Sequence, residues 1–102
     1  MIVYNVTLNV DEKIHQEWLQ WMREVHIPEV LATGLFIEHK FLRLLSHEAE
    51  NTGFTYAVQY FLPDLPTYET YRLHYAPALQ AQTTAKFGDK VVAFRTILET
   101  VE

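Results

Sequence analysis

The first stretch of the chain, MIVYNVTLNVDEKIHQEWLQWM (residues 1–22), decides the fold, because the spacing of its apolar side chains changes within it. Apolar residues alternate with polar ones up to Val10, which is typical of a strand with one buried face. Asp11 can then cap a helix, and Glu12 favours the positive end of that helix. The stretch therefore predicts a strand that leads directly into an amphipathic helix.

The apolar stripe of this first helix recurs at helical spacing, and its members are Ile14, Trp18, Trp21, Met22 and Val25. Pro28 lacks a backbone donor and disfavours helical geometry at Ile27, so we expect the helix to kink or restart there. Gly34 is a natural end for it. The stripe could line a ligand cavity, but this spacing is more typical of side chains that cover a sheet.

Three more strands and a second helix are predicted downstream. The strands cover residues 35–45, 54–62 and 91–101, and a polar turn (46–53) joins the first two. The second helix has Pro66 in its first turn, is interrupted at Pro77 and ends at Gly88. The order βαββαβ predicts one ferredoxin-like α+β domain over residues 1–102. Its four-stranded antiparallel sheet carries two helices on one face, with the first and third strands in the centre.

Both faces of this sheet are rich in apolar side chains. Alternate side chains of a strand point to opposite faces, and each such set is called a phase here. The phase expected to face the helices contains Tyr4, Val6, Leu8, Phe54, Tyr56, Val58, Tyr60, Val92, Phe94 and Leu98. The opposite phase contains Val3, Asn5, Thr7, Ala57, Gln59, Phe61, Val91, Ala93, Arg95 and Ile97. A face in water is usually more polar than this second set. We therefore expect a homodimer of the dimeric α/β-barrel type, in which two sheets face each other.

The second strand supports this expectation, because it is apolar on both of its sides. Its two sets are Ile37, Phe41 and Leu45 on one side and Phe36, Leu42 and Leu44 on the other. An edge strand of this kind invites pairing unless a second surface covers it.

Composition and charge exclude several classes of function. A formal net charge of −5 argues against a nucleic-acid partner, and no apolar run is long enough to cross a membrane. The chain has no cysteine and its N-terminus lacks signal-peptide features, so we expect a cytoplasmic protein. The histidines, His15, His26, His39, His47 and His74, show no metal-ligand spacing. With only three glycines, the chain has no phosphate-binding loop. We therefore expect no metal and no cofactor.

Asn5, Gln59 and Arg95 are the first group of candidate site residues, because three neighbouring strands should bring them to one face. One interpretation is a polar network inside the dimer that fixes the register. The other is a ligand pocket, in which Arg95 holds a carboxylate or another anion while the two amides orient it. A buried arginine without a matching acid favours some anion.

His26 and the second helix supply the remaining candidates. His26 could satisfy carbonyls that Pro28 leaves free, or it could be a general base or ligand contact. Trp21 is a candidate for the lining of a ligand pocket. Tyr71 and Tyr75 belong to the apolar stripe of the second helix, with hydroxyls that can reach water. His74 lies off that stripe. The sequence assigns no catalytic residue.

Four segments carry a resemblance to a known family: MIVYNVTLNVDE, WMREVHIPEVLATG, TYAVQYF and FGDKVVAFRTIL. They resemble an uncharacterised bacterial family of about this length, a domain of unknown function. The resemblance implies a ferredoxin-like domain of the dimeric α/β-barrel type and no established activity. The wider superfamily to which it is similar includes cofactor-free monooxygenases, haem-degrading enzymes and stress-response proteins.

Two functions follow as hypotheses. The first is a homodimer that binds a small anionic or aromatic molecule between sheet and helices. The alternative is an oxygenase-like enzyme that resembles the haem-degrading or cofactor-free monooxygenase dimers. The haem-degrading relatives place an asparagine on the first strand and a histidine on the second helix, where this chain has Asn5 and His74. Those relatives also have a tryptophan just before that helix, where this chain reads PDLP.

Overall fold

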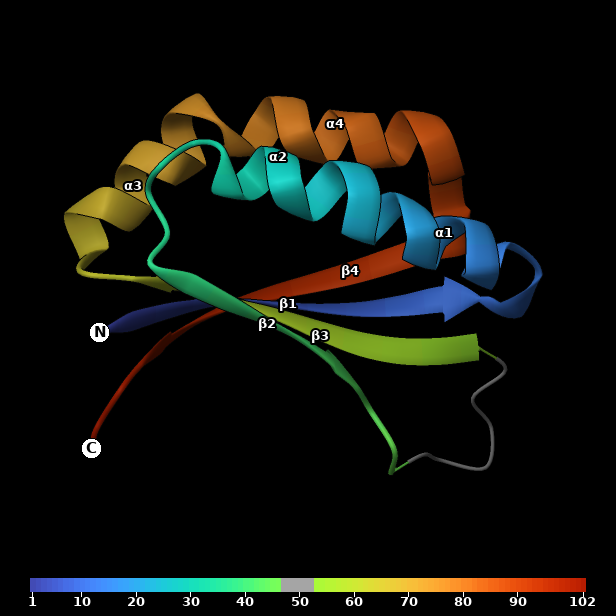
Figure 1. Cartoon of the computed structure of the whole chain (residues 1–102), viewed down its shortest axis with the longest axis horizontal. Coiled ribbons are helices and arrows are strands. Elements are labelled where there is room, and N and C mark those ends of the chain that lie inside the picture. The colour runs from blue at the N-terminus through green and yellow to red at the C-terminus, as the bar shows by residue number, and fades with distance from the viewer. Residues whose placement is uncertain (47–52) are drawn as a thin grey trace.

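The computed structural model describes residues 1–46 and 53–102, and its helices all lie on one face of a four-stranded antiparallel sheet (Figure 1). The strands are β1 (Ile2–Asp11), β2 (Glu38–Arg43), β3 (Gly53–Leu62) and β4 (Val91–Glu99), in the order β2-β3-β1-β4. This confirms the ferredoxin-like α+β fold with β1 and β3 in the centre. The polar turn predicted between β2 and β3 lies almost entirely outside the described residues.

Each of the two predicted helices is present as a series of shorter helical segments. The first series is η1 (Glu12–Ile14), α1 (His15–Trp21), the π-helix η2 (Met22–His26) and α2 (Ile27–Leu31). The second series is α3 (Leu65–His74), α4 (Ala76–Phe87) and η3 (Gly88–Lys90). Both interruptions occur next to a proline, since Pro28 and Pro77 lie in the first turns of α2 and α4.

The ends of the helices follow the expected chemistry. Asp11 accepts a hydrogen bond from the backbone N–H of Lys13 at 2.8 Å, and Asp64 accepts one from Thr67 at 2.9 Å. Asp64 thereby caps α3, which has Pro66 in its first turn. Gly34 follows α2 with a φ of 78°. These local signals explain why the element order could be predicted.

The π-helical segment η2 changes which side chains of the first helical series face the sheet. The N–H of Ile27 bonds to the carbonyl of Met22, five residues back, so one extra residue enters the turn. Trp18 and Met22 are buried as predicted, but Val25 is 38% exposed and Ile27 takes its place. The prediction of Val25 in the apolar stripe is therefore wrong, because the spacing of 3.6 residues does not continue through η2.

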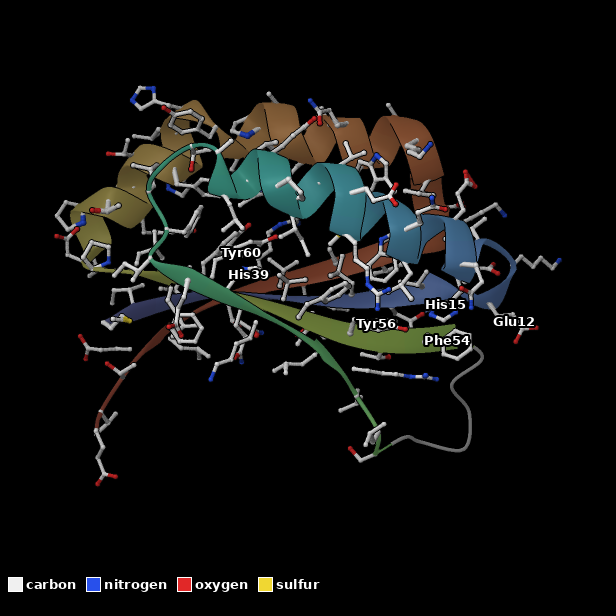
Figure 2. All side chains as sticks on the ribbon, viewed as in Figure 1. Glu12, His15, His39, Phe54, Tyr56 and Tyr60 are labelled. Carbon is white, nitrogen blue, oxygen red and sulfur yellow. The ribbon has the colours of Figure 1, made fainter. Side chains whose placement is uncertain are left out.

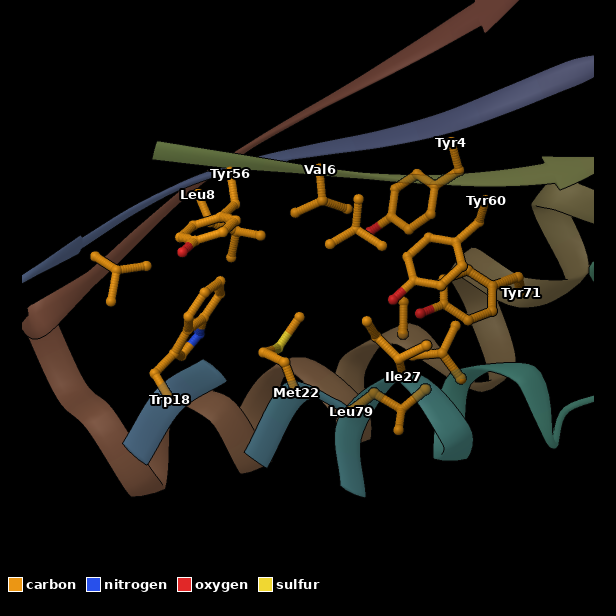
Figure 3. Packing of buried hydrophobic residues seen from close by; sticks show 14 of the residues in the cluster. Tyr4, Val6, Leu8, Trp18, Met22, Ile27, Tyr56, Tyr60, Tyr71 and Leu79 are labelled. Carbon is orange, nitrogen blue, oxygen red and sulfur yellow. The ribbon is translucent and has the colours of Figure 1, made fainter. Parts of the chain in front are cut away.

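The core lies between the sheet and the helices (Figure 3). Its strand residues include Tyr4, Val6, Leu8, Val10, Tyr56, Val58, Tyr60 and Leu62, all from the predicted buried phase of β1 and β3. Trp18 is fully buried against Phe41 and Tyr56, so it is a core residue. His15 is also buried at the start of α1, where its Nε2 lies 2.6 Å from the Tyr56 hydroxyl and its ring stacks on Phe54 (Figure 2).

The phase of β4 is opposite to the one predicted. Arg95 pairs with Val6 and Ala93 with Leu8, so these two β4 residues share the helix-covered face with the core. Val92, Phe94 and Leu98 instead lie on the face without helices, where each is exposed. The more apolar phase of β4 was assigned to the core, but a strand with two apolar phases does not reveal its own orientation. A shift of one residue in register exchanges all side chains between the faces.

The two sides of the second strand also differ from the prediction. Phe36, which was grouped with Leu42 and Leu44, packs on the helix side against Tyr60 and Tyr71. Ile37, which was grouped with Phe41, is exposed. Both residues precede β2, which begins only at Glu38, so the alternation of a strand does not apply to them.

Candidate functional site

A cavity of about 180 Å³ lies between the sheet and the helical layer. Its apolar wall comes from β1, β3, β4 and three helical segments: Val6, Leu8, Met22, Val30, Val58, Leu79, Val91 and Ala93. An apolar protein cavity of roughly 150 Å³ can hold a benzene molecule. The space therefore accommodates a molecule of about one six-membered ring with small substituents.

The polar groups that line the cavity share one property. They are Tyr4, Tyr60, Tyr71, His26, Gln80, Thr83, Thr84 and Arg95. All of them can donate a hydrogen bond, and none is a carboxylate. The chain as a whole has 13 acidic residues and 8 basic ones. An acidic protein thus has a cavity whose lining carries a positive charge and no negative one.

Arg95 is placed at this cavity by its position on β4, the edge strand next to β1. The residue is exposed, so the expectation of a buried arginine is wrong, and in the described part of the chain it makes no ion pair with an acid. The guanidinium interacts with the hydroxyl of Tyr4, and a guanidinium at an apolar cavity without an acidic partner suits a carboxylate or another planar anion.

His26 enters the cavity because η2 turns it toward the sheet. Its ring stacks on that of Trp21, with 4.9 Å between the ring centres, and its Nδ1 is buried without a hydrogen-bond partner. Burial, helped by the positive charge of Arg95, lowers the pKa of His26 to about 4. The imidazole is therefore neutral at physiological pH. Since Nδ1 has no partner, His26 does not use it to satisfy carbonyls near Pro28.

Three tyrosines extend the polar part of the lining. The ring of Tyr4 lies 6.0 Å from that of Tyr60 and 5.4 Å from that of Tyr71, centre to centre. Burial raises the pKa of all three hydroxyls, and for Tyr4 the nearby Arg95 partly offsets this rise. All three hydroxyls therefore stay protonated and can donate hydrogen bonds.

The structure separates the three residues that were predicted to share a face. Asn5 and Gln59 pair with each other across β1 and β3 on the face without helices, whereas Arg95 lies on the other face. The amide of Asn5 donates to the hydroxyls of Thr7 (3.2 Å) and Thr96 (3.3 Å). The predicted grouping is wrong for Arg95, because the phase of β4 is reversed.

The remaining predicted residues have different positions. Trp21 supports the ring of His26 and contacts Phe87 but does not line the cavity. His74 and Tyr75 lie at the break between α3 and α4 beside a separate surface depression. His74 is exposed and Asn5 is on the opposite face of the sheet, so the two residues that suggested haem are not brought together.

Sequence reasoning missed Tyr4 and Tyr60, which it assigned only to the core, and Gln80, Thr83 and Thr84. One signal was present: strand positions that face a core carry tyrosine rather than phenylalanine, and a buried hydroxyl needs a partner. Among the described residues, no group of His, Cys, Asp and Glu side chains could hold a metal ion. Within the same residues, no helix has the length and apolar character needed to cross a membrane.

Comparison with known proteins agrees with this fold. The model of a family described as a domain of unknown function (DUF4286) matches residues 1–101, which confirms the resemblance noted in the sequence. No protein with a curated description matches the chain.

Two solved structures are similar to the chain. The first is an ethyl tert-butyl ether d (EthD) family protein from Bacillus halodurans C-125, with 17% identity, a TM-score of 0.68, and coverage of 99% of this chain and 100% of that one. The second is a dimeric ferredoxin-like protein from an uncultured marine organism, with 11% identity, a TM-score of 0.56, and coverage of 99% and 95%. At these identities the likeness shows the shared fold.

Proposed function

We propose that this chain, which belongs to the DUF4286 family of unknown function, binds a small anionic molecule of about one ring between its sheet and its helices. The observation that carries the proposal is the lining of the cavity. The lining contains no carboxylate, and it combines apolar side chains with the neutral imidazole of His26 and the guanidinium of Arg95, which has no acidic partner among the described residues. The apolar part of the ligand occupies the interior, and its carboxylate or similar group lies at Arg95.

The proposed binding unit is a homodimer of single ferredoxin-like domains (residues 1–102) in the cytoplasm. Its support is the face of the sheet without helices, which presents Val92, Phe94 and Leu98 to solvent. Glu38 and Lys40, both on β2, supply the charges on that face, apart from Asp11 at the end of β1. Exposed apolar side chains that gather on one face are typical of a partner surface. The resemblance of the fold to a dimeric ferredoxin-like protein agrees with this arrangement.

Calorimetric titration with benzoate and with benzamide, its uncharged analogue of similar size, tests the binding proposal. We expect benzoate to bind more tightly than benzamide, because only benzoate can form a charge-assisted bond with Arg95. In Arg95→Met, which keeps the length of the apolar stem, we expect benzoate affinity to fall by about 10- to 100-fold, the effect of losing one hydrogen bond to a charged group.

The matched control is Arg23→Met, because Arg23 is an exposed arginine on η2 that does not line the cavity. Its benzoate affinity should equal that of the unchanged protein. Equal affinity for benzoate and benzamide, or an Arg95→Met variant that binds benzoate normally, would contradict the proposal.

A further inference from the structure

Two hydroxyl groups deep in the cavity have no protein partner. Tyr60 is 2% exposed and Tyr71 is 3% exposed, yet neither hydroxyl makes a hydrogen bond with any described residue. Both side chains line the cavity and project into the space between β3 and the helices (Figure 3). The same rings pack against Phe36, which holds them in place.

In the described part of the chain, the fully enclosed polar side-chain atoms without a partner are Trp18 Nε1 and His26 Nδ1, so the two tyrosine oxygens border the open space of the cavity. A hydroxyl group that faces such a space without a partner costs free energy unless a ligand or water bonds to it. Phenylalanine at both positions would fill the core without this cost. The two hydroxyls face a cavity large enough for a ligand, so an oxygen atom of that ligand can be their partner. Burial raises the pKa of both groups, so they act as donors to a hydroxyl or carbonyl oxygen.

Tyr60 and Arg95 lie on different strands, β3 and β4, whereas Tyr71 lies on α3. Tyr60 pairs with Tyr4 on β1, and Arg95 pairs with the next residue of the same phase, Val6, from the other side. Two strand spacings and one two-residue step separate the Cα atoms of Tyr60 and Arg95 by about 12 Å. Since Tyr60, Tyr71 and Arg95 all line the same cavity, a ligand of one ring inside it can contact both the guanidinium and the tyrosine hydroxyls.

We infer that the ligand has two polar ends: a carboxylate or similar anion held by Arg95, and a hydroxyl or carbonyl oxygen held by Tyr60 and Tyr71. This makes the ligand class a single-ring hydroxy acid or oxo acid. The inference rests on the proposed function, since it describes the second end of the same ligand. It assigns the two tyrosines as binding residues that determine specificity.

Calorimetric titration compares 4-hydroxybenzoate with 4-methylbenzoate and, separately, 3-hydroxybenzoate with 3-methylbenzoate. The methyl group has nearly the size of the hydroxyl but cannot form a hydrogen bond. We expect the better hydroxy acid to bind about tenfold more tightly than its methyl partner, as one or two hydrogen bonds provide. The preference should disappear in Tyr60→Phe or in Tyr71→Phe.

Tyr68→Phe is the control, because Tyr68 packs against Tyr4 but does not line the cavity. It should keep the preference. Thermal unfolding of each variant shows that it is folded. Equal affinity for the hydroxy and methyl acids would overturn the inference, and so would a preference for the hydroxy acid that persists in both tyrosine variants. Neither result would contradict the proposed anion site at Arg95. Failure of every carboxylate to bind overturns the proposed function itself.

Discussion

His26 and Arg95 occupy one cavity although the chain separates them by 69 positions. Burial disfavours the charged form of the imidazole, and the nearby guanidinium disfavours it further. The same two influences prepare the site for an anion, because a positive charge and uncharged donors face an apolar space without a competing carboxylate. The low pKa of His26 thus results from the arrangement that we propose for binding.

The stability of the protein should depend on pH through His26. The pKa of this side chain is about 4 in the folded chain and 6.5 when unperturbed, so between these values the unfolded state binds more protons. Stability should therefore fall as the pH decreases from 6.5 to 4, by roughly 2 to 3 kcal/mol from this residue. Urea unfolding at pH 7, 5.5 and 4.5 measures the loss, which should be smaller in His26→Gln.

The pKa of His15 is lowered as well, by burial and by the charge of Arg43, so part of the pH dependence remains in His26→Gln. The informative quantity is the difference in slope between the two proteins. Parallel curves of unfolding free energy against pH would contradict the prediction.

Two irregular segments adjoin the elements that line the cavity. The π-helix η2 contains His26, and the short helix η3 leads from α4 into β4, whose pairing with β1 sets which of its side chains face the core. Between α4 and β4, Gly88 has φ 60° and ψ −134°, a conformation that side-chain-bearing residues rarely adopt. The backbone at this point depends on glycine.

Gly88→Ala should destabilise the protein by about 1 to 2 kcal/mol. The cost comes from the backbone, because apart from the neighbouring residues of the chain no described atom lies within 4 Å of the position that a Cβ would take. Denaturant unfolding measures it, with Lys90→Ala as the control. Lys90 is exposed in the same segment and lacks a positive φ, so its replacement should change stability by less than about 0.5 kcal/mol. A Gly88→Ala protein as stable as the original would disprove the strain.

The two faces of the sheet differ in what covers them. One face, with Tyr4 and Arg95, lines the core and the cavity, and the other carries the hydrogen-bonded amide of Asn5 together with exposed apolar side chains such as Phe94. Because the amide nitrogen of Asn5 already has hydroxyl partners, covering this face would not leave that group unpaired.

Phe94 lies on that second face and is 65% exposed, so Phe94→Glu should prevent self-association. Burial of a carboxylate in an apolar interface without a partner is unfavourable. Light scattering at micromolar concentration should report two chains per particle for the unchanged protein and one for the variant. Leu73→Glu, an equally drastic change at an exposed position on α3, should remain dimeric. One chain per particle in the unchanged protein would end the dimer proposal.

Local patterns were enough to predict most elements of this fold. The alternation in β1, the cap at Asp11, the prolines that interrupt both helical series and the glycine after each of them are short-range features. Their effects depend on a few neighbouring residues, so they can be identified without knowledge of the rest of the chain. The order of the strands then follows from standard chain connections.

The site could be predicted only in part. His26 and Arg95 were both candidates, but they were assigned different surroundings, and Tyr60 was assigned only to the core. A strand with apolar residues in both phases can present either one to the helices, and the choice depends on pairing between β1 and β4, about 90 residues apart in the chain. Residue types thus indicated an anion site, whereas the long-range register and the extra residue in η2 brought those side chains together. Both are properties of packing, which short-range preferences do not specify.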